Sequence, residues 1–411
     1  MIPTDDLPPP PGGAPFAMLD GIRVLDLTTS IAGPYATLAL ADYGAEVIKI
    51  ERIGHGDDSR LWGPPFLDGE SLWFLSVNRN KRSIALDYTG EEGCALLAEL
   101  ISASDVLVTN QVSRVQEKLG TDAATVRSIR PDIIHASLTG FGTSGRRKDW
   151  VAYDLIAEGY SGVMDLTGEA DREPQKVGTP AGDLLTGMDL TTAIIAALFE
   201  RQRTGKGRTL DISMIESMTR FMSSRLISYL GSGELARRAG GRESVIAVYQ
   251  TFDTADEPIT LGLGNDAIWK RFWVAAGLPD KAEDESRATN PLRRQQRAEI
   301  VGEIQGVLSQ RSRAEWLDIF AEHRVPAGPI NRLDQVAEDE TLLERGFLYA
   351  MARDGKPDAP QVGTGILVDG EANSPRSAPP DLSADTDDVL QTILGKSADD
   401  IASLRDRGVL G

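Results

Sequence analysis

The first 140 residues alternate between short apolar segments and longer helical segments, and this alternation restricts the fold more than any other feature. Buried strands are predicted at Ile22–Leu27, Val47–Glu51, Asp105–Asn110 and Ile133–Leu138. Helices are predicted between them at Gly33–Tyr43, Glu91–Ser102 and Thr125–Ile129. Strands that are joined through helices run parallel, so the sequence predicts an α/β fold with a parallel sheet and helices on both faces.

A ligand site is expected at one edge of this Rossmann-like sheet. Open parallel sheets bind ligands beyond the carboxyl ends of their strands, which here places Thr28–Ala32, Arg52, Asn110 and Thr139 around one crevice. The first turn, Thr28–Pro34, lacks the G-x-G-x-x-G pattern of dinucleotide-binding folds. An NAD-type site therefore has no support from the sequence.

Composition excludes several classes of function. The 411 residues carry a net charge of −19, which disfavours nucleic acid and anionic membrane surfaces as partners. Cys94 is the single cysteine, and His55, His135 and His323 are far apart, so the sequence indicates neither a disulfide nor a metal site. It has no apolar run of membrane-spanning length and no signal peptide pattern, and we expect a cytoplasmic location.

The chain is long enough for two domains. Residues 1–20, with prolines at Pro8–Pro11, are predicted to be a mobile tail. A large Rossmann-like domain is expected at 21–230 and 345–411, a smaller α+β domain at 243–330, and linkers at 231–242 and 331–344.

One carboxylate stands out in the Gly-rich segment Val177–Leu190. Asp183 follows Gly182 and precedes an apolar helix predicted at Leu184–Glu200. A helix N-terminus favours an ionised carboxylate, and the glycine lets a bulky ligand approach the backbone, so Asp183 is a candidate nucleophile. Alternatively, Asp183 is an ordinary N-cap residue, because aspartate is preferred at that position.

Several motifs, taken in order, resemble the class III CoA-transferases, the family of formyl-CoA transferase and crotonobetainyl-CoA:carnitine CoA-transferase. The motifs are Val24–Thr28, Ala32–Pro34, Gly44–Arg52, Asn80–Asp87, Asp105–Asn110, Ala136–Gly142, Gly182–Asp183, Thr204–Gly207 and Val325–Asn331. They extend over almost the whole chain after Gly21.

The resemblance implies that CoA moves from an acyl-CoA to a carboxylic acid through anhydride and thioester intermediates on Asp183. Coenzyme A would be a co-substrate, with no permanently bound cofactor and no metal, and the protein would be an interlocked homodimer. The family's CoA contacts fall on Ile31, Ala32, Arg52, Leu86, Thr89, Asn110, Gln111, Val112, Lys118 and Thr139. Some differ in residue type, since Lys118 replaces an arginine and Thr139 a lysine.

Residues of the acyl pocket are less closely determined by the resemblance. The candidates are Thr29, Tyr153, Gly262 and Gly264, and the two glycines form either a loop that closes over the site or a plain hairpin turn. Related 2-methylacyl-CoA racemases have a histidine where Tyr153 stands, and a tyrosine with a pKa of about 10 is a poor two-way proton shuttle. A racemase-like enzyme and a non-catalytic acyl-CoA-binding protein are the alternative functions.

Overall fold

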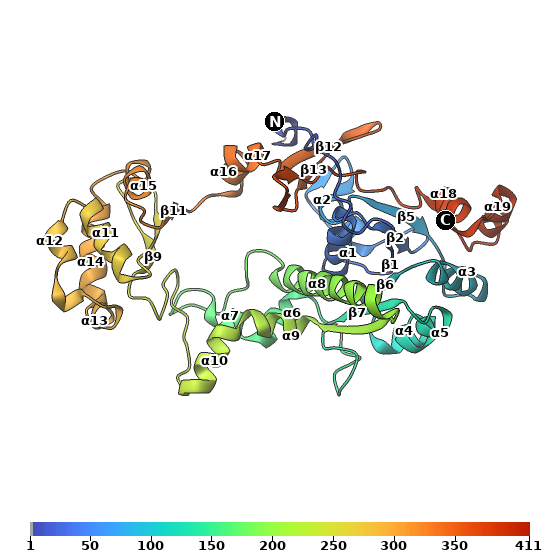
Figure 1. The fold of residues 1–411 in the computed structure, drawn as a ribbon, viewed down its shortest axis with the longest axis horizontal. Helices are drawn as coiled ribbons and strands as arrows, with labels where there is room; N and C mark the ends of the chain where they lie inside the picture. Colours follow the sequence, from blue (N-terminus) through green and yellow to red (C-terminus); the bar gives the residue numbers. More distant parts are fainter. Residues whose placement is uncertain (1–2) are drawn as a thin grey trace. The chain divides into compact units, whose positions relative to one another are not determined.

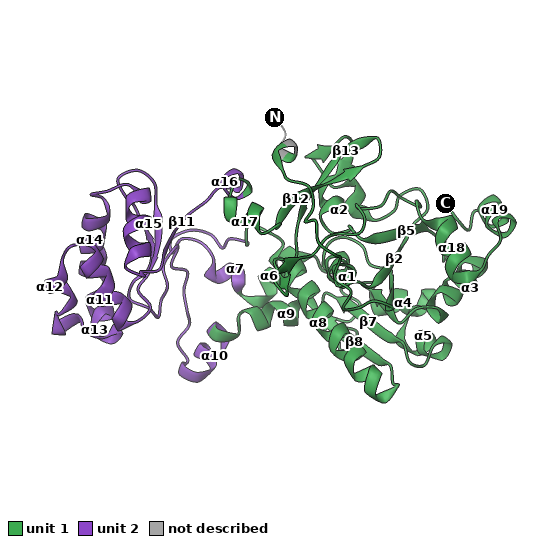
Figure 2. Cartoon of the chain, turned by 45° about the horizontal axis from the view of Figure 1, so that its top comes forward, with its two compact units in different colours: residues 1–162, 177–224, 337–411 green, residues 163–176, 225–336 purple. Residues whose placement is uncertain are grey.

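A computed structural model describes residues 3–411 and divides the chain into two compact units (Figure 2). Unit 1 comprises residues 1–162, 177–224 and 337–411, and unit 2 comprises residues 163–176 and 225–336. Both units are therefore built from separate stretches of the chain.

Unit 1 is organised around a six-stranded parallel sheet in the order β5-β2-β1-β6-β7-β8 (Figure 1). The strands are β1 (Arg23–Asp26), β2 (Glu46–Glu51), β5 (Lys81–Ala85), β6 (Val106–Thr109), β7 (Ile134–Thr139) and β8 (Arg208–Ser213). If these six strands are numbered by their order in the chain, their order across the sheet is 3-2-1-4-5-6, as in Rossmann folds. The predicted α/β class is confirmed.

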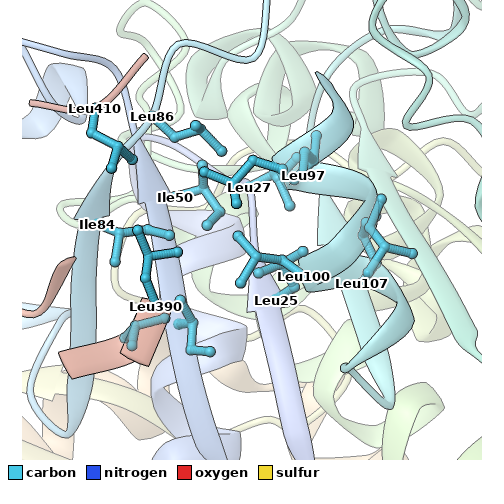
Figure 3. Packing of buried hydrophobic residues seen from close by; sticks show 14 of the residues in the cluster. Leu25, Leu27, Ile50, Ile84, Leu86, Leu97, Leu100, Leu107, Leu390 and Leu410 are labelled. Atoms are coloured by element: carbon cyan, nitrogen blue, oxygen red, sulfur yellow. The ribbon is translucent and has the colours of Figure 1, made fainter. Parts of the chain in front are cut away.

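Helices cover both faces of the sheet. On one face α1 (Ala32–Asp42) packs against α8 (Ala181–Thr204). On the other face lie α3 (Glu91–Ser102), α5 (Ala123–Ile129), α18 (Thr386–Leu394) and α19 (Ala398–Asp406). Side chains such as Leu25, Ile50 and Ile84 alternate toward this second face and meet Leu97, Leu100 and Leu390 of its helices (Figure 3).

The remaining elements of unit 1 are short. They are η1 (Pro3–Asp6), η2 (Asp58–Leu61), β3 (Phe66–Leu67), β4 (Glu70–Ser71), α2 (Leu72–Ser76), α4 (Ser113–Leu119), α6 (Asp154–Ser161), α9 (Met214–Phe221), α17 (Glu340–Glu344), β12 (Leu348–Arg353), β13 (Lys356–Val362), β14 (Leu367–Val368) and β15 (Glu371–Ala372).

Unit 2 has its own core. Its antiparallel sheet consists of β9 (Tyr249–Phe252), β10 (Ile259–Gly262) and β11 (Ala327–Pro329). Its further elements are α7 (Val163–Leu166), α11 (Asp266–Ala275), α12 (Pro279–Ala282), η3 (Glu285–Arg287), α13 (Asn290–Gln295), α14 (Arg297–Leu308) and α15 (Arg313–Glu322). Buried Trp269, Phe272, Trp273, Trp316 and Phe320 fill the space between helices and sheet. Helices α10 (Ser223–Ser232) and α16 (Leu333–Ala337) contain two of the four points where the chain changes unit.

Three local expectations differ from the structure. Residues 8–16 of the expected mobile tail are packed on unit 1, because the buried Phe16 donates its N–H to Asn373 Oδ1 at 2.9 Å and Pro8 accepts the N–H of Ala350 at 2.9 Å; Met1 and Ile2 lie outside the described residues. The stretch expected as a linker at 331–344 forms α16 and α17. Residues 163–176, expected in the large domain, belong to unit 2, where Gly168 accepts the N–H of Gly240 at 3.0 Å.

Helix α8 is the one helix among residues 3–411 that is long and apolar enough to cross a membrane, judged by length and composition alone. No such run was expected from the sequence. In unit 1 this helix packs against α1, α6 and α9 and against strands β7 and β8. Its apolar character therefore matches that of a core helix.

Candidate active site

Asp183 is the third residue of α8 and its side chain is half-buried. The N-cap position is occupied by Pro180, which makes no side-chain capping bond. Asp183 therefore does not cap its own helix, and the N-cap interpretation is wrong.

The capping group comes from another helix. Asp154, the first residue of α6, accepts the N–H of Gly182 at 2.7 Å and the N–H of Asp183 at 3.3 Å through Oδ1. Two of the four N–H groups that a helix N-terminus leaves unpaired are satisfied in this way. The carboxylate of Asp183 itself accepts no hydrogen bond from any group in the described part of the chain.

Burial and, to a smaller extent, the nearby carboxylate of Asp154 together raise the pKa of Asp183 from 3.8 to about 7. From the sequence we expected a lowered pKa, because a helix N-terminus favours the ionised form of a carboxylate. That expectation was wrong because the first-turn N–H groups point at Asp154 and not at the side chain of Asp183. Protonated and ionised forms of Asp183 are therefore both populated near neutral pH.

The first turns of α8 lie against the turn between β1 and α1. A Cβ placed on Gly187 would lie 2.7 Å from the carbonyl oxygen of Ala32 and 3.0 Å from Cδ1 of Tyr35. Leu184 packs with Ile31 in a small apolar cluster. Asp183 and Gly187 are four residues apart and share a helix face, so Asp183 lies on the side of α8 that meets Ile31 and Ala32.

Three side chains hold the turn between β1 and α1. The buried Lys49 donates to the carbonyl oxygen of Thr28 at 2.8 Å. Asp57 accepts the N–H of Ser30 at 2.9 Å, and Ser30 has a left-handed φ of 71°. Asn110 pairs with both backbone groups of Thr29, at 3.2 and 2.8 Å. The turn is thus held in a conformation that a non-glycine residue seldom adopts.

Two buried ion pairs lie near this turn, and three of their four residues, Lys49, Lys81 and Asp26, belong to strands of the sheet. Lys49 pairs with Asp57 at 2.8 Å, and Lys81 lies 3.2 Å from Asp26. Burial opposes ionisation of Asp26, but Lys81 and Lys49 outweigh it and lower the pKa of Asp26 to about 2. Asp26 and Lys81 contact α1, where Thr37 donates to Asp26 at 2.6 Å and the carbonyl oxygen of Pro34 accepts from Lys81 at 2.8 Å.

A hollow of about 190 Å³ lies beside this turn at the carboxyl ends of the strands. Five of the residues predicted from the sequence line it, namely Thr28, Thr29, Arg52, Asn110 and Gln111. The side chain of Arg52 is exposed and pairs with Asp58. Tyr88 also lines the hollow and accepts a hydrogen bond from Gln111 at 3.1 Å. Tyr88 lies within Leu86–Thr89, the stretch on which the resemblance places CoA contacts.

The remaining predicted contacts are more scattered. The side chain of Leu86 is buried in the sheet core, and its N–H donates to the carbonyl oxygen of Glu51 at 2.9 Å. Thr89 is exposed and donates its hydroxyl to Asp87 at 2.6 Å. Val112 is the N-cap residue of α4, and Lys118 is exposed in the last turn of that helix. None of these four residues lines the hollow.

Thr139 ends β7 and is buried, and its hydroxyl has no hydrogen-bond partner within residues 3–411. Tyr153 precedes Asp154 as the N-cap residue of α6, with 66% of its surface exposed. Gly262 and Gly264 belong to unit 2, where Gly262 pairs with Tyr249 as the last residue of β10. The described residues contain no group of three or more His, Cys, Asp or Glu side chains placed to hold a metal ion.

The fold and this site define a Rossmann-type α/β protein in which a half-buried carboxylate lies on the helix that packs against the turn after β1, at the carboxyl ends of the strands. Comparison with known proteins gives the particular family. The chain belongs to CoA-transferase family III, whose pattern matches residues 19–386.

Individual relatives match over most of their length. Succinyl-CoA:glutarate CoA-transferase of Mus musculus is 37% identical over 394 residues, which are 95% of this chain and 90% of the relative. Acetyl-CoA:oxalate CoA-transferase of Acetobacter aceti is 35% identical, over 84% of this chain and 88% of its own. The crystal structure of a CAIB/BAIF family protein from Brucella suis superimposes with a TM-score of 0.79 at 35% identity, covering 91% of this chain and 99% of that one.

Proposed function

We propose that the protein transfers CoA from an acyl-CoA thioester to a carboxylic acid, with Asp183 as the nucleophile. One observation carries the assignment of Asp183. Its half-buried carboxylate lies at the start of α8, free of hydrogen-bond donors from residues 3–411, on the side of the helix that meets the turn at Ile31 and Ala32. A carboxylate without competing donors keeps its lone pairs available for attack.

The transfer proceeds in four substitutions at carbonyl carbon. An oxygen of ionised Asp183 attacks the donor thioester, the C–S bond breaks, and CoA leaves as a thiolate. The thiolate then attacks the aspartyl carbonyl of the mixed anhydride, releasing the donor acid as a carboxylate and leaving an aspartyl-CoA thioester.

The acceptor carboxylate attacks this thioester and again releases the CoA thiolate. The thiolate finally attacks the acceptor carbonyl of the second anhydride, giving acceptor acyl-CoA and regenerating the Asp183 carboxylate. Each step exchanges one anion for another, so no net proton transfer is required. Water must be kept from both kinds of intermediate, because either would hydrolyse.

Short dicarboxylic acids and their CoA thioesters are the proposed substrate class. The relatives bear the names succinyl-CoA:glutarate, acetyl-CoA:oxalate and succinyl-CoA:mesaconate CoA-transferase, and each acceptor in these names is a dicarboxylate. Identities of 35 to 37% over most of the chain support a shared substrate class.

Coenzyme A is proposed to bind along the carboxyl edge of the sheet as a co-substrate. The hollow lined by Thr29, Arg52 and Gln111 supports this placement. The exposed pair of Arg52 and Asp58 is of a kind that contributes about 0 to 1 kcal/mol, so Arg52 can exchange Asp58 for a phosphate at little cost.

We further propose a cytoplasmic homodimer. In unit 1 the segment around α6 exposes several large apolar side chains, a surface that a second copy would cover. They are Trp150, Val151, Tyr153, Leu155, Ile156 and Tyr160. Light scattering is expected to give about twice the chain mass of 44.3 kDa. Full activity from a monomer would contradict this proposal.

The experiment that tests the function combines activity with covalent trapping. Succinyl-CoA, acetyl-CoA and glutaryl-CoA are each incubated with succinate, glutarate, oxalate and mesaconate, and products are read by mass spectrometry. Without acceptor, the enzyme is expected to become acylated. Borohydride should reduce the aspartyl thioester to an alcohol on the peptide that contains Asp183. Label on another carboxylate would contradict the mechanism.

Asp183→Asn is the decisive variant, and Asp189→Asn on the same helix is its control. Loss of the nucleophile should reduce turnover by roughly a thousandfold or more. The variant must be assayed before deamidation restores aspartate. The racemase alternative is tested with a chiral 2-methylacyl-CoA in deuterated water, where rapid exchange of the α-proton without CoA transfer would favour it.

A further inference from the structure

We infer that Asp154 is a positioning residue for the transfer: it holds the N–H groups of Gly182 and Asp183 and places a fixed negative charge beside the nucleophile. The inference rests on the proposed role of Asp183. It concerns a residue 29 positions away in the sequence, on a different helix.

Helix α6 fixes the approach to α8 with two carboxylates. Asp154 binds the N–H groups of Gly182 and Asp183, and the fully buried Glu158 accepts the N–H of Val177 at 2.8 Å. The two acids are four residues apart and lie on one face of α6. A single face of this helix therefore determines the path of residues 177–183 and the position at which Asp183 enters α8.

Gly182 makes this contact possible. A Cβ on Gly182 would lie 3.0 Å from Asp154 Oδ1 and 3.4 Å from Cγ of Met218. A methyl group at this position would crowd the oxygen that caps the helix. The glycine of the Gly182–Asp183 pair thus admits the carboxylate of Asp154, a role that the sequence did not suggest.

The fixed charge favours the chemistry of Asp183. When both carboxylates are ionised they repel each other in a site that is partly closed to water. Acylation converts Asp183 into a neutral anhydride, so the repulsion is relieved as the first bond forms. An interaction that is unfavourable in the free enzyme and weaker in the transition state lowers the barrier. The hydrogen bonds from Gly182 and Asp183 to Asp154 keep the backbone of Asp183 in place, so the two carboxylates cannot move apart to relieve the repulsion.

Two substitutions separate the cap from the charge. Asp154→Asn keeps an acceptor oxygen for the two N–H groups and removes the charge, whereas Asp154→Ala removes both. Asp122→Asn is the matched control, because Asp122 caps α5 in the same way, accepting the N–H groups of Ala124 and Thr125 at 3.0 and 3.1 Å.

The measurement is the rate of acylation by succinyl-CoA without acceptor, read by quenched intact-protein mass from pH 5 to 9. In wild type the rate should rise with the ionisation of Asp183, with a midpoint near 7. In Asp154→Asn the midpoint should move down by about one pH unit, because the neighbouring negative charge is gone. The plateau should fall roughly tenfold, because acylation no longer relieves a repulsion equivalent to about one pKa unit. Asp122→Asn should superimpose on wild type.

Asp154→Ala should reduce acylation at every pH and speed amide hydrogen exchange at Gly182 and Asp183, which Asp154→Asn should leave slow. If Asp154→Ala fails to fold, Asp154→Asn alone decides the role of the charge. A pH profile of Asp154→Asn identical to that of wild type in midpoint and plateau would overturn the inference.

Failure of the inference can be told from failure of the proposed function. No acylation of wild type by any of the three thioesters would overturn the function, and the catalytic role of Asp154 with it. The contact is then measured without catalysis, from melting temperatures of the Asp154→Asn and Asp183→Asn variants and their double mutant. At pH 8 each single variant should melt at a higher temperature than wild type, because each removes one of the two charges that repel each other. The increase in the double mutant should be smaller than the sum of the two single increases. Full additivity would overturn the electrostatic part of the inference.

Discussion

Gly187 of α8 lies against the carbonyl oxygen of Ala32 at the start of α1, with space for a hydrogen atom but not for a methyl group. A Cβ there would be only 2.7 Å from that oxygen, which belongs to backbone and cannot rotate away. This contact sets the distance between the helix that carries Asp183 and the turn proposed to meet coenzyme A.

Gly187→Ala should therefore destabilise the protein by about 1 to 3 kcal/mol, the usual cost of overpacking, although alanine is the better helix former. The matched control is Gly302→Ala in α14, where a Cβ meets no atom within 4 Å. That variant should be neutral or more stable by up to about 1 kcal/mol. Urea unfolding measures both, and equal effects would show that the contact between α1 and α8 is looser than described.

Replacing Lys49 by Met tests the buried ion pair under the turn between β1 and α1. The change leaves Asp57 buried with no cation and should cost about 3 to 5 kcal/mol. Arg52→Met removes the exposed pair with Asp58 and should cost no more than about 1 kcal/mol. Unfolding midpoints compare the two, and a Lys49 variant as stable as the Arg52 variant would contradict the assignment.

Asp183→Asn should make the protein more stable at pH 8. The pKa of Asp183 is 3.8 in the unfolded state and about 7 in the folded state. Below pH 3.8 the side chain is protonated in both states and does not lower the stability. The loss of stability grows between pH 3.8 and pH 7 and is complete above pH 7. Three pKa units correspond to about 4 kcal/mol as an upper limit. The gain of the variant should disappear toward pH 4.

Chemical unfolding at pH 4, 6 and 8 measures this dependence. Asp171→Asn, on an exposed segment, serves as the control and should show no comparable trend. A gain for Asp183→Asn that stays constant with pH would mean that the carboxylate is not destabilised by its site.

Asn110→Ala should weaken the binding of the acyl-CoA more than it slows the chemistry. Asn110 holds both backbone groups of Thr29, and the turn loses this clamp when the amide is removed. We expect KM for the acyl-CoA to rise roughly tenfold, since each lost hydrogen bond of this kind contributes about 1 kcal/mol, with kcat changed less. Asn110→Asp keeps only the acceptor and should be intermediate. An unchanged KM for Asn110→Ala would show that the turn at Thr29 does not contribute to CoA binding.

The parallel sheet and its helices could be predicted because their residues repeat with the periods of strands and helices. The apolar runs at β1, β2, β6 and β7 and the apolar helix that contains Asp183 are local signals of this kind. Within the parallel sheet, β5 (Lys81–Ala85) was not predicted as a strand. The polar pair Lys81 and Arg82 opens β5, and Lys81 is fully buried because Asp26, on another strand, neutralises it.

The sequence by itself determined that Asp183 lies between a glycine and an apolar helix, because these residues are consecutive in the chain. Only the tertiary structure decided what surrounds it. Asp154 lies 29 residues away and reaches Gly182 and Asp183 solely because α6 packs against α8. The direction of the pKa shift at Asp183 follows from that neighbour and from burial. Both depend on distances through space, which the order of residues along the chain does not contain.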